Sequence, residues 1–223
     1  MQRYQFPRRE VLKMSAAAVA AGLLAPLLHS LPAKAATDAG RSLVAYFSMP
    51  ETDKPGNMTR EEENSTVVVD GRVLGNTQYV AELIQQMTGS DIFRILPQKP
   101  YPVNHRALVD LAKEEQEQNA RPAIANSIVA PESYGTIFIG YPNWWADMPM
   151  IMYTFLEQYD FSGRTIIPFC THGGSGLSGT VSSIQKKQPQ AKVVRTAFCL
   201  SRSRMEEAPE SVAKWLKKIG YKI

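Results

Sequence analysis

The chain has 223 residues, with 25 Lys and Arg against 21 Asp and Glu, and a formal net charge of +4 at pH 7. Residues 1–35 carry five basic side chains and one acidic one, so the remaining 188 residues are close to neutral. A neutral domain does not attract nucleic acid or an anionic membrane electrostatically, and we expect neither partner. The two cysteines and three histidines exclude a disulfide scaffold and a multi-cysteine metal site, and we expect no metal.

Residues 1–35 have the three parts of a cleaved export signal. Arg8 and Arg9 precede an apolar, alanine-rich run over residues 14–28, and Ala33-Lys34-Ala35 provides a small-x-small cleavage motif. The run is too short and too weakly apolar for a membrane span, so no membrane anchor is expected after cleavage. The arginine pair resembles a twin-arginine (Tat) signal, with an ordinary secretory signal as the alternative. We therefore expect residues 36–223 to form one exported domain, periplasmic or secreted.

Residues 43–47 form a continuous apolar run, which is typical of a central parallel strand covered on both faces. The composition then turns polar over an insertion at residues 49–74. Here we expect a loop, a solvated charge run at residues 61–63, and a hairpin that turns at Asp70-Gly71. A helix follows over residues 76–89.

The rest of the chain alternates between apolar runs and helical periodicity. The pattern predicts strands at residues 91–96, 136–140, 164–170 and 191–200, and helices at residues 104–119, 149–159, 177–187 and 205–219. This alternation predicts an α/β fold, an open, doubly wound sheet of five parallel strands with helices on both faces.

Two of these strands end in loops of special composition. The strand at 136–140 leads into Pro142-Asn143-Trp144-Trp145-Ala146, and the strand at 164–170 leads into Thr171-His172-Gly173-Gly174-Ser175-Gly176. Ligands of open α/β sheets bind at the carboxyl ends of the strands. An aromatic loop that faces a glycine-rich loop suits a flat ring system.

Three motifs resemble those of the flavodoxin family, in particular its exported flavodoxin-like members of the short-chain type. Tyr46-Phe47-Ser48 followed by Gly75-Asn76-Thr77 is similar to the first phosphate loop, which the insertion interrupts here. Residues 140–145 resemble the second flavin loop, and residues 171–176 the third. The resemblance covers residues 43–219, and it implies the strand order 2-1-3-4-5 and FMN as the cofactor.

The resemblance also assigns roles to single residues. The amino terminus of the helix at 76–89 offers free N–H groups and a positive dipole end to the FMN phosphate. Ser48, Asn76 and Thr77 add side-chain donors, provided that the insertion returns to Ser48. Trp144 or Trp145 stacks on the flavin ring, or else the pair fills the core or faces a partner. The other implied cofactor-binding residues are Pro142, Asn143, Ala146, Thr171, Gly173, Gly174, Ser175 and Gly176.

Several further residues have two interpretations. His172 is either a catalytic proton donor or a brace of its own loop. Asp147 is expected to cap the next helix, and His105 to be a surface or cap residue. Cys170 and Cys199 end neighbouring predicted strands, as buried free thiols or as a disulfide.

The resemblance implies an FMN-binding redox protein that carries electrons outside the cytoplasm, to a redox partner protein or a small-molecule acceptor. One alternative is an FMN-dependent NAD(P)H:quinone or nitro reductase on the same fold, because the third loop lacks the tyrosine that covers the ring in many flavodoxins. Another is a binding module without redox chemistry, in which the tryptophans face a partner.

Overall fold

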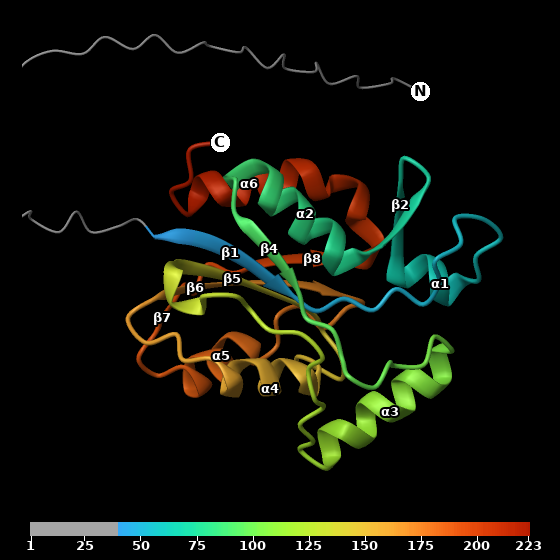
Figure 1. Cartoon of the computed structure of the whole chain (residues 1–223). Coiled ribbons are helices and arrows are strands. Elements are labelled where there is room, and N and C mark those ends of the chain that lie inside the picture. The colour runs from blue at the N-terminus through green and yellow to red at the C-terminus, as the bar shows by residue number, and fades with distance from the viewer. Residues whose placement is uncertain (1–39) are drawn as a thin grey trace, which may run out of the picture. The chain divides into compact units, whose positions relative to one another are not determined.

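The computed structural model describes residues 40–223, and the predicted export signal lies outside them. A parallel sheet forms their centre (Figure 1). Its strands are β1 (Arg41–Tyr46), β4 (Asp91–Arg94), β5 (Tyr134–Pro142), β6 (Thr165–His172), β7 (Lys192–Val193) and β8 (Phe198–Ser201). The order is β4-β1-β5-β6-β7, with β8 also paired to β6, and every pair is parallel. Counting β7 and β8 as one interrupted strand gives the predicted order 2-1-3-4-5.

The sequence predicted one continuous fifth strand over residues 191–200. The structure has two short strands there, β7 and β8. β7 pairs with Thr165 and Ile166, and β8 pairs with β6 from Phe169 onward. The Ile166 carbonyl accepts a bond from Val194, so Pro168, two residues on, also faces the fifth strand but has no N–H to donate. The proline therefore accounts for the break between the two short strands.

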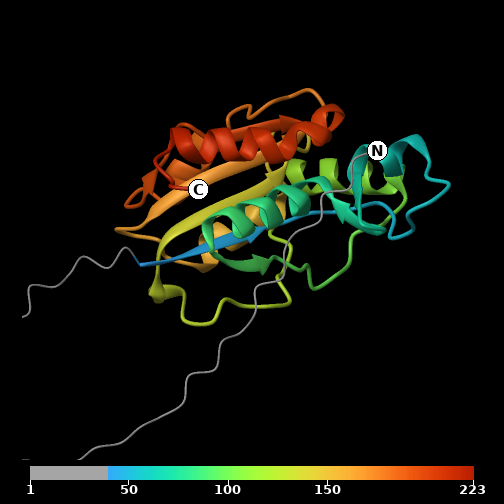
Figure 2. The same ribbon diagram turned by 90° about the horizontal axis from the view of Figure 1, so that it is seen from above.

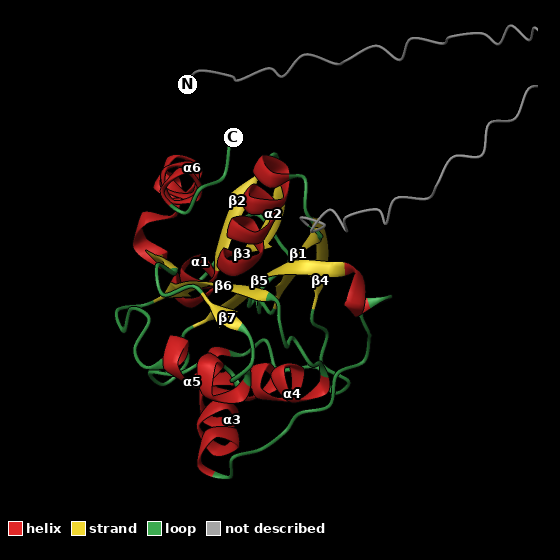
Figure 3. Cartoon of the chain, turned by 90° about the vertical axis from the view of Figure 1, so that its left-hand side faces the viewer, coloured by secondary structure: helices red, strands yellow, loops and turns green. Residues whose placement is uncertain are grey.

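Helices cover both faces of the sheet (Figure 3). Within residues 40–223, no helix is long and apolar enough to cross a membrane. α2 and α6 lie on one face and α4 and α5 on the other, with α3 packed against α4. Their bounds are α2 (Asn76–Thr88), α3 (His105–Glu117), α4 (Met150–Gln158), α5 (Thr180–Lys187) and α6 (Ala208–Lys218), with 3-10 turns η1 (Pro131–Ser133) and η2 (Arg202–Glu207).

Two of these helices begin three residues later than predicted. α6 starts at Ala208 because Pro209 is tolerated only in the first turn of a helix. α5 starts at Thr180 because Gly176 and Ser178 have left-handed backbone angles, φ 61° and 49°, which end any helix that would begin at Leu177.

The apolar run at residues 43–47 reflects the position of β1 between two helical layers. Leu43, Ala45 and Phe47 pack into the core beneath α4, whereas Val44 and Tyr46 pack into the core beneath α2 and α6. Because both faces of β1 are covered, the strand shows no alternation of apolar and polar residues.

The insertion contains α1 (Arg60–Ser65) and a hairpin of β2 (Thr66–Val69) and β3 (Arg72–Gly75). The hairpin turns at Asp70-Gly71, as predicted, and both residues have positive φ. The charge run at 61–63 was predicted to be solvated, and it is, with Glu61 and Glu63 exposed on α1; that the run is helical was not predicted. Thr59 and Glu62 make a reciprocal capping box, and acidic side chains in the first turn complement the helix dipole.

We predict that Gly140→Ala destabilises the fold. A Cβ atom at Gly140 of β5 would lie 2.1 Å from the buried ring of Phe169 on β6. Overpacking of this kind costs about 1–3 kcal/mol of unfolding free energy, which urea denaturation measures. Gly56→Ala is the control, since no heavy atom lies within 4 Å of its added Cβ. Equal stability of the two variants would contradict the packing described here.

Candidate functional site

A cavity of about 290 Å³ opens at the carboxyl ends of β1, β5 and β6. The strand order reverses between β1 and β5, and this is the position at which open α/β sheets bind their ligands. Every residue proposed above for the site lines the cavity except Ala146 and Gly176. The lining residues of that set are Ser48, Asn76, Thr77, Pro142, Asn143, Trp144, Trp145, Thr171, His172, Gly173, Gly174 and Ser175.

The insertion brings Gly75 back beside Ser48. The predicted phosphate loop requires this, because residues 49–74 separate its two parts in the sequence. Ser48 is only 5% exposed, and its Oγ accepts a bond from the backbone N–H of Gln78 at 3.3 Å. A Cβ atom at Gly75 would lie 2.2 Å from the same Oγ, so only glycine allows this approach. Figure 2 shows the insertion beyond the carboxyl end of β1.

The amino terminus of α2 lies at the cavity, and Ser48 Oγ accepts the Gln78 N–H of its first turn. Its N-cap is Gly75, and its first turn has no acidic residue that would repel an anion. Asn76 donates from Nδ2 to the Asn64 carbonyl at 2.8 Å, and its buried Oδ1 has no hydrogen-bond partner among residues 40–223. The Thr77 and Thr171 hydroxyls share a bond of 2.7 Å. This corner of the cavity therefore has the properties of an anion site.

The two tryptophans of the aromatic loop have different surroundings. Trp144 packs edge-on against Phe47 and Tyr101, with ring centres 5.6 Å away in both cases. Trp145 is 48% exposed, and its Nε1 donates to the Val109 carbonyl of α3 at 3.0 Å. Trp144 is thus half-buried against the core and Trp145 is the more exposed of the two, and both line the cavity.

The sequence predicted that Asp147 caps α4, and this prediction is wrong. The N-cap of α4 is Pro149, whose side chain makes no capping hydrogen bond. Asp147 accepts instead from the Met148 N–H at 2.8 Å and from the Tyr153 hydroxyl at 2.9 Å. The carboxylate therefore ties the aromatic loop to α4.

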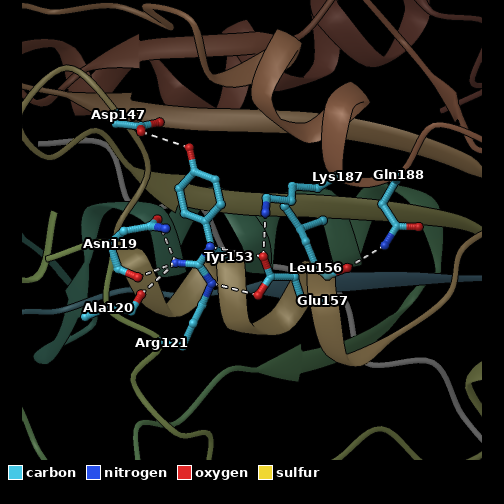
Figure 4. Close-up of polar contacts among 9 residues, drawn as sticks. All are labelled: Asn119, Ala120, Arg121, Asp147, Tyr153, Leu156, Glu157, Lys187 and Gln188. Atoms are coloured by element: carbon cyan, nitrogen blue, oxygen red, sulfur yellow. Dashed lines mark hydrogen bonds and ion pairs between the residues drawn. The ribbon is translucent and has the colours of Figure 1, made fainter.

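A charged cluster holds Tyr153 in place beneath that loop (Figure 4). Glu157 of α4 accepts two bonds from Arg121 and one from Lys187 of α5. Both cations also lie over the Tyr153 ring, 5.3 and 5.7 Å from its centre. The cluster joins the loop before β5 to α4 and α5, and Tyr153 links it to Asp147 of the aromatic loop.

The glycine-rich loop is braced by His172 and by Asn143. The Gly174 N–H donates to His172 Nδ1 at 3.0 Å, so the bracing role of His172 is present. Asn143 donates from Nδ2 to the Gly176 carbonyl at 2.9 Å, which holds the aromatic and glycine-rich loops together. Asn143 Oδ1 is a second buried acceptor without a hydrogen-bond partner in the described residues.

Several lining residues were not foreseen as site residues. His105 begins α3 after the N-cap Asn104 and is an exposed surface residue, as one of the two predictions had it, but it also bonds to the buried Glu51. Arg202 follows β8, and its guanidinium lies 3.0 Å from the position that a Cβ on Gly173 would take. Because Arg202 directly follows a strand of the sheet, its position in the sequence could have indicated that it is a site residue. The other unforeseen lining residues are Met49, Glu61, Asn64, Ser65, Leu108, Val109 and Ala112.

Cys170 on β6 and Cys199 on β8 lie opposite each other in the strand pairing. Both are free thiols, so the predicted alternative of a disulfide is not the one found. The hydrogen bond with Cys199, together with burial, raises the pKa of the Cys170 thiol, which therefore stays protonated. Within residues 40–223 no three His, Cys, Asp or Glu side chains gather as a metal site would require.

The sequence pattern that defines the flavodoxins matches residues 66–219, and the chain belongs to the flavodoxin family. The match begins at the hairpin of the insertion and ends just after α6, so it includes two of the three loops and the start of α2. No curated protein matches the chain.

Solved structures agree with this assignment. A protein of Bacteroides eggerthii DSM 20697, provisionally described as a flavoprotein, is 26% identical with a TM-score of 0.61, over 82% of this chain and 99% of that one. A similarly described protein of Bacteroides uniformis ATCC 8492 is 27% identical with a TM-score of 0.60, over 80% and 98%. A flavoprotein of Lactobacillus acidophilus NCFM in complex with FMN is 18% identical with a TM-score of 0.52, over 79% and 98%, and shares the fold.

We predict that His172 titrates below its ordinary pKa of 6.5, because burial disfavours the imidazolium. The unfolded chain then takes up the proton first, so the stability that His172 contributes is present above pH 6.5 and is lost as the pH falls through the folded pKa. The unfolding free energy of His172→Gln should therefore decline less from pH 7 to pH 5 than that of the wild type. NMR titration measures the pKa directly, and a value at or above 6.5 would refute this.

We predict that Glu157→Gln weakens the cluster beneath the aromatic loop. Bonds from Arg121 and Lys187 lower the pKa of Glu157 from 4.5 to about 2, so its contribution is present above pH 4.5 and is lost as the pH falls towards 2. Because Glu157 is 39% exposed, we expect a loss of only about 0.5–1 kcal/mol at pH 7, shrinking below pH 4.5. Urea denaturation across this range measures it, with the exposed Glu132→Gln as control.

Proposed function

We propose that the chain binds FMN in this cavity and works as a redox protein that carries electrons outside the cytoplasm. The observation that supports the proposal best is the meeting of three loops and the amino terminus of α2 in one cavity at the strand-order reversal. A structure of the same fold holds FMN. Bound FMN supplies one- and two-electron redox chemistry, and the protein supplies position and electrostatics.

The phosphate end of FMN fits the corner at α2. The backbone N–H groups of the first turn and the dipole of α2 favour an anion, and Ser48 and Thr77 add hydroxyl donors. The buried Oδ1 atoms of Asn76 and Asn143 are acceptors without partners in the described residues. FMN carries hydroxyl and N–H donors that satisfy such atoms, so the residues present suit this cofactor.

The ring end fits the aromatic and glycine-rich loops. Both tryptophans line the cavity, and Trp145, the more exposed of the two, offers a large flat apolar contact beside Trp144. The backbone of Gly173 to Ser175 lies beside Arg202, so this edge carries a positive charge that the family resemblance did not imply. In this proposal these groups orient the ring and exclude water from one side of it.

The export part of the proposal rests on residues 1–35. A twin-arginine signal suits a protein that acquires its cofactor in the cytoplasm, because that route exports folded proteins. The electron acceptor is then a partner protein or a small molecule. A second candidate, NAD(P)H-dependent quinone or nitro reduction, is favoured by the part of the cavity that α1 lines with polar groups and α3 with mainly apolar ones. Steady consumption of NAD(P)H with a quinone separates it from simple electron carriage.

We predict that the mature chain binds FMN more tightly than riboflavin, since only FMN has the phosphate. Thr77→Val should weaken FMN binding roughly tenfold or more while changing riboflavin binding little, because a bond to a charged group contributes about 1.5–3 kcal/mol. Quenching of flavin fluorescence gives both dissociation constants. Thr88→Val at the other end of α2 is the control, as its hydroxyl bonds to the Ile84 carbonyl. A mature chain that binds neither flavin would refute the proposal.

A further inference from the structure

A carboxylate and an imidazole form a pair in the cavity, outside the three loops. Glu51 follows β1 and is 8% exposed, and His105 Nδ1 lies 2.9 and 3.1 Å from its two carboxylate oxygens. The Glu51 backbone N–H donates to Ser65 Oγ at 3.0 Å, which ties the backbone of Glu51 to the end of α1. The pair thus joins the insertion to the first turn of α3, and both residues line the cavity.

The carboxylate decides which atom of the ring is free. An ionised carboxylate only accepts hydrogen bonds, so His105 Nδ1 carries the proton that Glu51 receives. Nε2, on the opposite edge, forms no hydrogen bond with any residue from 40 to 223, and the side chain is 45% exposed. Nε2 is therefore the atom that can exchange a proton with a bound molecule and with solvent.

His172 lies in the same cavity, but its ring is engaged by the glycine-rich loop. Its Nδ1 accepts from the Gly174 N–H, and burial lowers its pKa, so its ring is neutral near pH 7. The other charged groups that line the cavity are Glu61 of α1 and Arg202 of η2. Beside His105, α3 presents the apolar side chains of Leu108, Val109 and Ala112. An apolar wall with one directed polar group is typical of a small-molecule site.

We propose that His105, positioned by Glu51, is the proton donor to a quinone-type acceptor bound between α1 and α3. The proposal rests on the FMN function above, because reduced FMN is the electron source. The acceptor takes up two electrons and one proton as a hydride equivalent from the reduced flavin, and the His105 imidazolium gives the second proton. The products are a hydroquinone, oxidised flavin and neutral imidazole, which solvent reprotonates at Nε2.

This role predicts an effect that depends on the acceptor. A quinone needs a proton as negative charge develops on its oxygen, and a positioned general acid contributes about 10²–10⁴-fold to such a step. Ferricyanide takes an electron without a proton. The ratio of the quinone rate to the ferricyanide rate should therefore fall at least about 100-fold in His105→Gln.

The experiment uses the FMN-loaded mature protein. FMN dissociation constants are measured first for the wild type, His105→Gln and Asn104→Ala, and then the reduced proteins are mixed with each acceptor by stopped flow. Asn104→Ala removes the N-cap bond to Ala107 and loosens the start of α3 without touching the pair. The ratio should be retained in Asn104→Ala. An equal fall in both variants, or a fall in FMN affinity with an unchanged ratio, would overturn the proposal.

A second measurement needs no cofactor. A phenol presents the product hydroxyl and cannot be reduced, and its titration should shift the ¹⁵N resonances of the His105 ring. Glu51→Gln should move those resonances from a single Nδ1–H tautomer towards a mixture, as expected of a positioning residue. An unshifted His105 in the phenol titration would overturn the site. If the wild type binds no FMN, the proposed function fails, whereas the phenol titration still reports on His105.

Discussion

The site depends on one constraint, the reversal of strand order between β1 and β5. Right-handed crossovers send the chain after β1 to α2 on one face of the sheet, and the chain after β5 to α4 on the other. No helix can then close the edge between the two strands, and a crevice remains there. The first, aromatic and glycine-rich loops all follow strands beside this crevice, so they meet although they lie far apart in the sequence.

The insertion adds to this plan without disturbing it. The hairpin pairs Gly75 with Thr66, and the Glu51 N–H bonds to Ser65 just before it, so the 26 inserted residues, 49–74, return Gly75 to Ser48. The segment in front of the hairpin contributes more than a connection, because α1 and Glu51 line the cavity opposite α3. A loop that interrupts a ligand-binding motif in the sequence thereby becomes a wall of the same binding site in space.

The sequence predicted what depends on local chemistry. Continuous apolar runs such as residues 43–47 reveal strands covered on both faces, and Asp70-Gly71 reveals its own turn. It failed where a distant residue decides the local structure. Pro168 on β6 interrupts the fifth strand between Val193 and Phe198. The Tyr153 hydroxyl bonds to Asp147, which does not cap α4. Glu51 bonds to His105, which lies 54 positions away in the sequence. The Thr59-x-x-Glu62 capping box was the one local signal of α1, and the neighbouring charges obscured it.

The hydroxyl pair of Thr77 and Thr171 allows the site to offer a hydrogen-bond donor at either of two positions. Either oxygen can be the donor in their shared bond of 2.7 Å, so one of the two protons is always left over. Rotating both hydroxyls moves that spare proton from α2 to the end of β6 while the heavy atoms stay in place. A nearly rigid sheet edge can thus present its donor at either of two positions, and it can match ligands of different polarity patterns without any rearrangement of the backbone.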